Sequence, residues 1–122
     1  MSYIFEEIDH EGLEALQAEG FVKLREMLFR KSVYDPTKVE AQLAAGRDGA
    51  TIQYQMNHQS LISYGGNIEQ QRGAANLIAS RWIERLAKEY PQLYPTVIVE
   101  LTPDEVIISL RSVARQKLKS TI

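Results

Sequence analysis

The stretch that decides the fold runs from Asn67 to Tyr90 and reads NIEQQRGAANLIASRWIERLAKEY. Asn67 is a favourable N-cap, and Gln70, three residues later, can reach back to the amide of Asn67 as in a capping box. Pro91 disfavours a helical conformation at the residue before it, so Tyr90 is the expected end. The stretch therefore predicts one long helix with two defined ends.

A helical projection of this stretch separates two sides. The expected core stripe consists of Ile68, Ala75, Ala79, Trp82, Ile83, Leu86 and Tyr90, with Ile78 at its edge. Leu77 points away from that stripe, beside the small residues Gly73 and Ser80. Because a glycine within a helix costs about 0.5–1 kcal/mol relative to alanine, this second side is either a contact surface for a partner or an exposed surface that tolerates the cost.

Composition and charge restrict the class of protein. The chain has 122 residues, of which 44% are hydrophobic and 25% charged, as expected for a single soluble globular domain covering residues 1–122. It contains no cysteine, which excludes disulfides and thiolate chemistry and fits a cytoplasmic location. We predict no signal peptide and no contact with a membrane. A net charge of −2 argues against nucleic-acid binding through overall charge.

The N-terminal third predicts a second long helix. Before it, the apolar residues Tyr3, Ile4, Phe5 and Ile8 are too few to distinguish a strand from a helical turn. From Asp9, a plausible N-cap, a helix is expected to run to Arg30. One side of this helix is expected to carry its main apolar stripe, and a second, weaker apolar stripe on the other side is formed by Ala15, Ala18, Val22 and Phe29. Two apolar sides favour packing against two neighbours, either within the chain or with another subunit.

The middle of the chain predicts a short helix followed by a hairpin. Asp35 and Pro36 open a helix that Gly46 ends after Ala45. From Ile52 to Met56, apolar and polar residues alternate, which predicts a half-buried strand. Residues 61–64 are the expected hairpin partner of that strand.

The C-terminal region predicts a second hairpin and a tail. Residues 97–101 and 106–110 alternate on either side of a turn at residues 102–105. Residues 112–122 resemble a frayed basic tail, and the basic residues at this end are Arg111, Arg115, Lys117 and Lys119. The expected order is α-α-β-β-α-β-β. It predicts a two-layer α+β domain with helices packed on a mostly antiparallel four-stranded sheet.

Within this order, the succession of helix, hairpin, helix and hairpin is similar to that of small phage tail-completion and connector proteins. The likeness is one of fold alone and no sequence motif carries it. It implies a structural component of a larger assembly such as a phage tail, whose location would be the virion.

A possible ligand site lies at the start of the long helix. Gly65, Gly66 and Asn67 lead into its amide terminus, and Arg72 follows one turn later. Glycines allow a ligand close to the backbone, and a helix N-terminus favours anions, so these residues could bind a small anion or nucleotide. The alternative role of Arg72 is a salt bridge to a neighbouring acid such as Glu69.

Residues for catalysis or metal binding are not evident. His10 lies between two acids at a helix start, and His58 lies in a predicted turn; neither has a second histidine at ligand spacing. We predict no catalytic residue, no metal site and no cofactor. The basic tail could bind a phosphate backbone or an acidic protein groove, although 14 basic against 16 acidic residues makes nucleic acid the less favoured partner.

These patterns favour a non-enzymatic interaction or assembly protein that forms homo-oligomers. The residues predicted to contact the partner are Val22, Phe29, Gly73, Leu77 and Ser80. The alternatives are an anion- or nucleotide-binding module at Gly65 and Gly66, and nucleic-acid binding through the tail.

Overall fold

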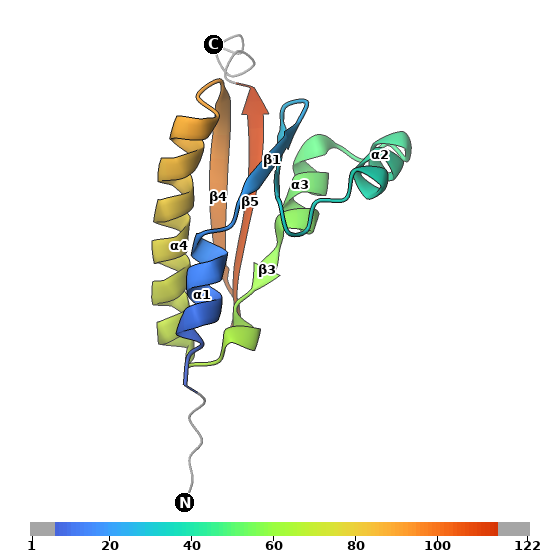
Figure 1. Cartoon of the computed structure of the whole chain (residues 1–122). Coiled ribbons are helices and arrows are strands. Elements are labelled where there is room, and N and C mark those ends of the chain that lie inside the picture. Colours follow the sequence, from blue (N-terminus) through green and yellow to red (C-terminus); the bar gives the residue numbers. More distant parts are fainter. Residues whose placement is uncertain (1–6, 115–122) are drawn as a thin grey trace, which may run out of the picture.

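The computed structural model describes residues 7–114, and Figure 1 shows how their helices and strands are arranged. The helices are α1 (His10–Gln17), α2 (Pro36–Ala44), α3 (Gly49–Asn57) and α4 (Ile68–Glu89), with a short 3-10 turn η1 (Ile62–Tyr64). The strands are β1 (Phe21–Leu24), β2 (Met27–Arg30), β3 (Gln59–Ser60), β4 (Leu93–Leu101) and β5 (Val106–Ala114). The predicted α+β class is confirmed.

The strands form two antiparallel sheets. One has the order β3-β5-β4, and the other is the hairpin of β1 and β2. The predicted single sheet of four strands is therefore wrong: the described residues have five strands, in one three-stranded and one two-stranded sheet. In Figure 1, α4 lies along β4, α1 lies beside α4, and α2 and α3 project on the opposite side of the molecule.

The long helix is confirmed as α4. The side-chain oxygen of Asn67 accepts a bond from the Gln70 amide at 2.8 Å, and the Gln70 side chain accepts one from the Asn67 amide at 2.9 Å, which completes the predicted capping box. Ile68 and Ile83, assigned to the core stripe, are instead 37% and 48% exposed. The buried face of α4 includes Ile78, on the side where α1 packs. Within residues 7–114, no helix or strand covers the flank of α4 that carries Ile68 and Ile83.

The helix expected from Asp9 to Arg30 is wrong beyond Gln17. Asp9 does cap α1, accepting a bond from the Gly12 amide at 2.9 Å, but residues 21–30 form the hairpin of β1 and β2. All four residues of β2 are buried because β2 lies between two core clusters: Leu28 packs in the larger one, and Phe29 in the smaller one. Val22 and Phe29, assigned to the second stripe of a helix, are instead directly opposite each other on one face of this hairpin.

The strand expected at Ile52–Met56 is also wrong, because this segment belongs to helix α3. Asp48 is its N-cap and accepts a bond from the Thr51 amide at 2.8 Å. Ile52 and Met56 are one helical turn apart, and both face the smaller core cluster. Their spacing is therefore that of one buried helix face and not that of one face of a strand. The expected hairpin partner is wrong as well, since residues 62–64 form η1 and only Gln59–Ser60 pairs with β5.

Two further elements match the prediction. Asp35 caps α2 with Pro36 in its first turn, and Gly46 follows the helix with a positive φ of 86°. The β4–β5 hairpin is confirmed, with the Thr102 amide bonded to the Glu105 carbonyl at 2.9 Å.

The predicted basic tail begins later than expected. β5 runs to Ala114, so residues 112–114 continue the strand, and Arg111 is an exposed residue of β5. Three basic residues assigned to the tail, Arg115, Lys117 and Lys119, lie outside the described residues.

We expect an Asp48→Ala variant to melt at a lower temperature than wild type at pH 7, by an amount that shrinks at low pH. Hydrogen bonds from the Thr51 amide, then from the Thr51 hydroxyl, hold the pKa of Asp48 below its usual value of 3.8. A carboxyl whose pKa is lower in the folded chain stabilises the fold above the unfolded pKa, and this contribution is lost as the pH falls through the folded value. Thermal melts at pH 7 and at successively lower pH test this. Asp104→Ala, at an exposed turn, is the control. A difference from wild type that stays constant with pH would contradict the expectation.

Candidate interaction surfaces

A groove of about 400 Å³ lies between α1 and α4. Apolar side chains dominate its lining, with Ile8 and Leu13 on one side and Ala74 and Leu77 on the other. Leu77 is 50% exposed, so a large apolar side chain of the lining is open to solvent. The groove is thus an apolar surface that a partner's side chain could fill.

Gly73 keeps this groove open. A Cβ placed on Gly73 would meet no atom within 4 Å, so the glycine is not required for close packing inside the chain. It leaves the α4 backbone uncovered between Ala74 and Gln70, where a partner could approach closely.

The residues predicted as a partner surface separate into two groups. Gly73, Leu77 and Ser80 are exposed on α4, and the first two line the groove. Val22 is half-buried in β1, whereas Phe29 is fully buried in the smaller core cluster and packs on Tyr34 at 5.4 Å between ring centres. Phe29 therefore has no exposed surface through which to contact a partner.

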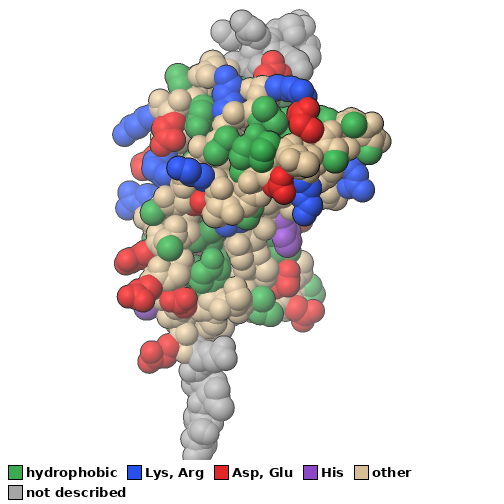
Figure 2. All heavy atoms as spheres, turned by 45° about the vertical axis from the view of Figure 1, so that its right-hand side comes forward, with side chains coloured by type: hydrophobic (Ala, Val, Ile, Leu, Met, Phe, Trp, Pro, Cys, Tyr) green, Lys and Arg blue, Asp and Glu red, His purple; other side chains and the backbone are tan. Residues whose placement is uncertain are grey.

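Charge is unevenly distributed around the groove. Figure 2 shows acidic side chains gathered low on the left side of that view, with Lys and Arg side chains above them. Glu11 and Glu14 are exposed acids of α1, and Glu14 also lines the groove. Arg81 and Lys88 are exposed cations in the second half of α4. A partner in the groove would therefore meet negative charge at the α1 side.

The structure gives the glycines before α4 a packing role. Gly66 has a φ of 76°, and a Cβ there would lie 3.1 Å from the Cβ of Ile8, so the position requires glycine. The side-chain amide of Gln71 donates to the carbonyls of Gly65 and Gly66, at 3.1 and 3.3 Å. The capping box of Asn67 described above uses further groups of this terminus.

Arg72 does not turn toward those glycines. Its guanidinium pairs with the Glu69 carboxylate at 2.9 Å on the exposed side of α4. This is the salt bridge considered as the alternative, and the structure leaves the anion site without its expected cation.

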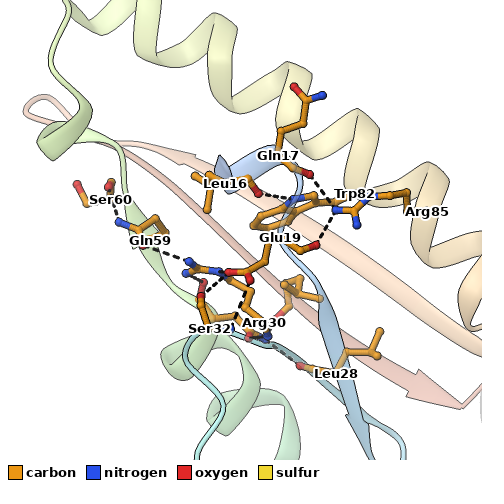
Figure 3. Close-up of polar contacts among 12 residues, drawn as sticks. Leu16, Gln17, Glu19, Leu28, Arg30, Ser32, Gln59, Ser60, Trp82 and Arg85 are labelled. Atoms are coloured by element: carbon orange, nitrogen blue, oxygen red, sulfur yellow. Dashed lines mark hydrogen bonds and ion pairs between the residues drawn. The ribbon is translucent and has the colours of Figure 1, made fainter. Parts of the chain in front are cut away.

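Side chains of α4 bind the end of α1 and the segment after it, as Figure 3 shows. The indole N–H of Trp82 donates to the Leu16 carbonyl at 3.1 Å. The Arg85 guanidinium donates to the carbonyls of Gln17 and Glu19, at 2.8 and 2.7 Å. The bond to Gln17 satisfies a carbonyl that the helix end leaves without an intrahelical partner, and all three bonds fix the end of α1 against α4.

Tyr90 extends this attachment to β1. Its hydroxyl donates to the Phe21 carbonyl at 3.1 Å. Burial, and then the negative charge of Glu89, raises the pKa of Tyr90 above its usual value. The phenol therefore remains the proton donor of this bond over the ordinary pH range.

A buried ion pair lies where β2 meets α3 (Figure 3). Arg30 Nε donates to Glu19 Oε1 at 3.0 Å, and only 5% and 9% of the two side chains are exposed. The guanidinium also donates to the Asn57 carbonyl at 3.2 Å and to Gln59 Oε1 at 3.3 Å, and the Ser32 hydroxyl donates to Glu19 Oε1 at 2.5 Å. Every member of this group is held by another, so the arrangement is that of a structural network.

Two side-chain amides of α3 connect β2 to β5. The oxygen of Gln53 accepts from the amides of Leu28 and Ser112, at 2.9 and 2.7 Å, and its nitrogen donates to the Ser112 carbonyl at 3.1 Å. One turn later, Asn57 accepts from the Arg30 amide at 2.8 Å and donates to the carbonyls of Leu28 and Leu110. These amides replace the strand that would otherwise pair with this edge of β5.

The sequence contained a signal for this arrangement that was not recognised. Gln53 and Asn57 are spaced by four residues, next to Ile52 and Met56 at the same spacing. On a helix, this pattern places two amides and two apolar residues on adjoining buried positions.

The histidines are exposed and have no metal-binding neighbours in the described part of the chain. His10 begins α1, and His58 caps the C-terminus of α3 with its ring 6.3 Å from that of Tyr54. Among residues 7–114, no group of three or more His, Asp or Glu side chains could hold a metal ion. No helix in the same range has the length and apolar character needed to cross a membrane.

Comparison of the chain with protein-family models, with curated proteins and with solved structures finds no match in any of the three.

Proposed function

We propose that the protein is a non-enzymatic interaction protein that assembles with protein partners through the exposed apolar surfaces of α4. The observation that carries this proposal is the presence of two such surfaces on one helix. Leu77 lies in the groove beside α1, while Ile68 and Ile83 lie on the flank turned away from α1. Exposed apolar patches of this kind are typical of protein contact sites.

The polar groups of the described residues support the same proposal. The buried acid, base and amides around β2, namely Glu19, Arg30, Gln53 and Asn57, are all bonded to one another or to the backbone. The buried Gln71 amide donates to the carbonyls of Gly65 and Gly66, and its Oε1 has no partner among the described residues. A catalytic group needs a partner that activates it and space for a substrate beside it. The groove instead offers an apolar lining with one carboxylate at its rim, which suits an apolar helical segment that carries a basic residue.

The likeness to phage connector proteins is not part of this proposal. It depended on the order helix, hairpin, helix, hairpin, with the first hairpin at residues 51–64. The structure has α3 in place of the first strand of that hairpin.

A Leu77→Asp variant is expected to lose partner binding while keeping the fold. Half of the Leu77 side chain is already in solvent, so the change costs the fold at most about 0.5–1 kcal/mol, while it puts a charge into the apolar groove. The test is capture of proteins from a lysate of the source cells by immobilised wild type, by the variant, and by Ala41→Asp. Ala41 is exposed on α2, so its variant adds the same charge away from the groove.

The expected result is one or more proteins retained equally by wild type and Ala41→Asp and lost with Leu77→Asp, at matched melting temperatures. Equal retention by all three forms would mean that the groove is not the contact surface.

A further inference from the structure

β4 is an edge strand with one open side. It ends the order β3-β5-β4, and within residues 7–114 no strand pairs with its second edge. In Figure 1, α4 runs along β4 on the side away from β5, and no other helix or strand is drawn beyond α4. Along the second half of β4, from Val97 to Leu101, this open side is a surface on which another strand can be added.

The register of the hairpin shows which peptide groups face outward. Leu110 and Ser112 direct their peptide groups toward α3, so the alternate β5 residue Ser109 directs its own toward β4. Ser109 is opposite Ile98, and pairing alternates along an antiparallel ladder. The N–H and C=O groups of Val97, Val99 and Leu101 therefore point away from β5, toward the open edge.

Apolar side chains border the same edge. Val97 and Val99 are half-buried, and Leu101 is 53% exposed. α4 packs mainly on β4, and its flank turned away from α1 carries the exposed Ile68 and Ile83. We call the open peptide groups of Val97, Val99 and Leu101, together with the exposed Ile68 and Ile83, the β4 edge surface.

We propose that the β4 edge surface binds a second copy of this chain, so that two β4 strands pair antiparallel about a two-fold axis at Val99. The proposal deepens the proposed function by naming the partner of one α4 flank, and it rests on that function. Only an antiparallel strand pair with identical residues opposite each other at its centre is compatible with a two-fold axis.

The two prolines near β4 select Val99 as the centre. Pro95 and Pro103 have no N–H to donate. A centre at Val99 places Val97 opposite Leu101 of the second copy, and about six hydrogen bonds form without involving either proline. A centre at Val97 would place Pro95 opposite Val99, and a centre at Ile98 would place Pro95 opposite Leu101; either loses a bond on each side because proline has no N–H.

The charge pattern of β4 agrees with this register. Glu100 is the only charged residue of β4. With the axis at Val99, Glu100 lies opposite Ile98 of the second copy, so the two carboxylates are not placed directly across from each other. Like charges directly opposite would destabilise the pair.

The same axis also brings the exposed residues of α4 together. The Leu93 amide bonds to the Tyr90 carbonyl at 3.0 Å, so the end of α4 and the start of β4 lie next to each other. From there, Val99 lies about 20 Å along β4, and the midpoint between Ile68 and Ile83 lies about 22 Å along α4. A two-fold axis at Val99 therefore brings Ile68 of one copy toward Ile83 of the other.

This helix contact supplies area that strand pairing lacks. A stable dimer buries about 1,200 Å² or more in total, which is more than a short ribbon of two strands provides. The exposed parts of Ile68, Ile83 and Leu101 add apolar area at the place where the two copies meet.

The test uses the absence of natural cysteines, so that one introduced thiol reports one position. Under mild oxidation at concentrations where light scattering shows a dimer, Val99→Cys is expected to form a disulfide-linked dimer. Directly opposite residues have Cα atoms about 5.5 Å apart, within the disulfide range of about 4.4–6.8 Å. Val97→Cys is the matched control, because the two copies of Val97 would be about 13 Å apart.

A second variant tests the helix contact without altering the strand. Ile83→Asp is expected to raise the dimer dissociation constant at least about tenfold in a light-scattering dilution series, since it places a charge among apolar side chains. Leu77→Asp, on the other flank of α4, should dimerise as wild type does. Circular dichroism shows whether each variant is folded.

Three results would overturn the proposal: a wild-type monomer at all concentrations, cross-linking of Val97→Cys instead of Val99→Cys, or unchanged dimerisation of Ile83→Asp. None of them bears on partner capture through the α1–α4 groove, so the two proposals can fail separately.

Discussion

An Asn57→Leu variant is expected to lose about 3–5 kcal/mol of unfolding free energy, because it removes three hydrogen bonds at once. Asn57 is fully buried, accepts from the Arg30 amide at 2.8 Å, and donates to the carbonyls of Leu28 and Leu110 at 2.9 and 3.0 Å. Leucine fills a similar volume but bonds none of them. Each buried backbone group left without a partner costs about 1–3 kcal/mol.

Urea denaturation measures this loss, and Gln55→Leu is the control. Gln55 is exposed on the same helix, where its side chain accepts only from Arg47 at 3.1 Å. Its replacement should change stability by no more than about 0.5 kcal/mol. Similar losses in the two variants would show that the amide bonds of Asn57 do not hold β2 to β5.

Arg30→Met is expected to destabilise the fold by about 3–5 kcal/mol. The Glu19 carboxylate would remain 9% exposed without its cation, and a buried charge that loses its partner is costly. Bonds from the guanidinium to the Asn57 carbonyl and Gln59 would also be lost.

Two comparisons isolate the effect of the buried charge. The double variant Glu19→Gln/Arg30→Met should be more stable than Arg30→Met alone, because it removes the unpaired carboxylate. Arg72→Met, which breaks the exposed pair with Glu69, should cost no more than about 1 kcal/mol. A double variant less stable than Arg30→Met would contradict the assignment of the cost to unpaired charge.

The elements that could be predicted are those whose signals are local. The start of α4 is marked by Asn67 and Gln70, which are three positions apart, and the start of α2 by the adjacent Asp35 and Pro36. Both signals can be recognised without knowledge of the core. The alternation in β4 and β5 is similarly local, because one face of that hairpin packs under α4.

The elements that could not be predicted depend on distant residues. β2 is buried on both faces because two core clusters meet on it, and no short pattern distinguishes that from one side of a helix. The sequence of α3 alternates like that of a strand because a polar residue, Gln53, occupies a buried position beside Ile52. The burial of Gln53 is explained by its bonds to β5, more than fifty positions away in the sequence.

The candidate surfaces follow the same division. Exposure of Leu77 and Gly73 follows from helical periodicity alone, so the groove side of α4 could be anticipated. Burial of Phe29 depends on α2 and α3 packing over β2, and exposure of Ile83 depends on β4 lying at the edge of its sheet. Those features require the tertiary arrangement.

The covering of β5 by α3 has a consequence for partly unfolded states. Side-chain amides satisfy that edge of the sheet, so it stays closed only while α3 remains docked. Local unfolding of α3 alone would uncover the peptide groups of Leu110 and Ser112, and with them those of Leu28 in β2. Newly opened strand edges are templates for aggregation, so docking of α3 would protect this chain against misassembly as well as stabilise it.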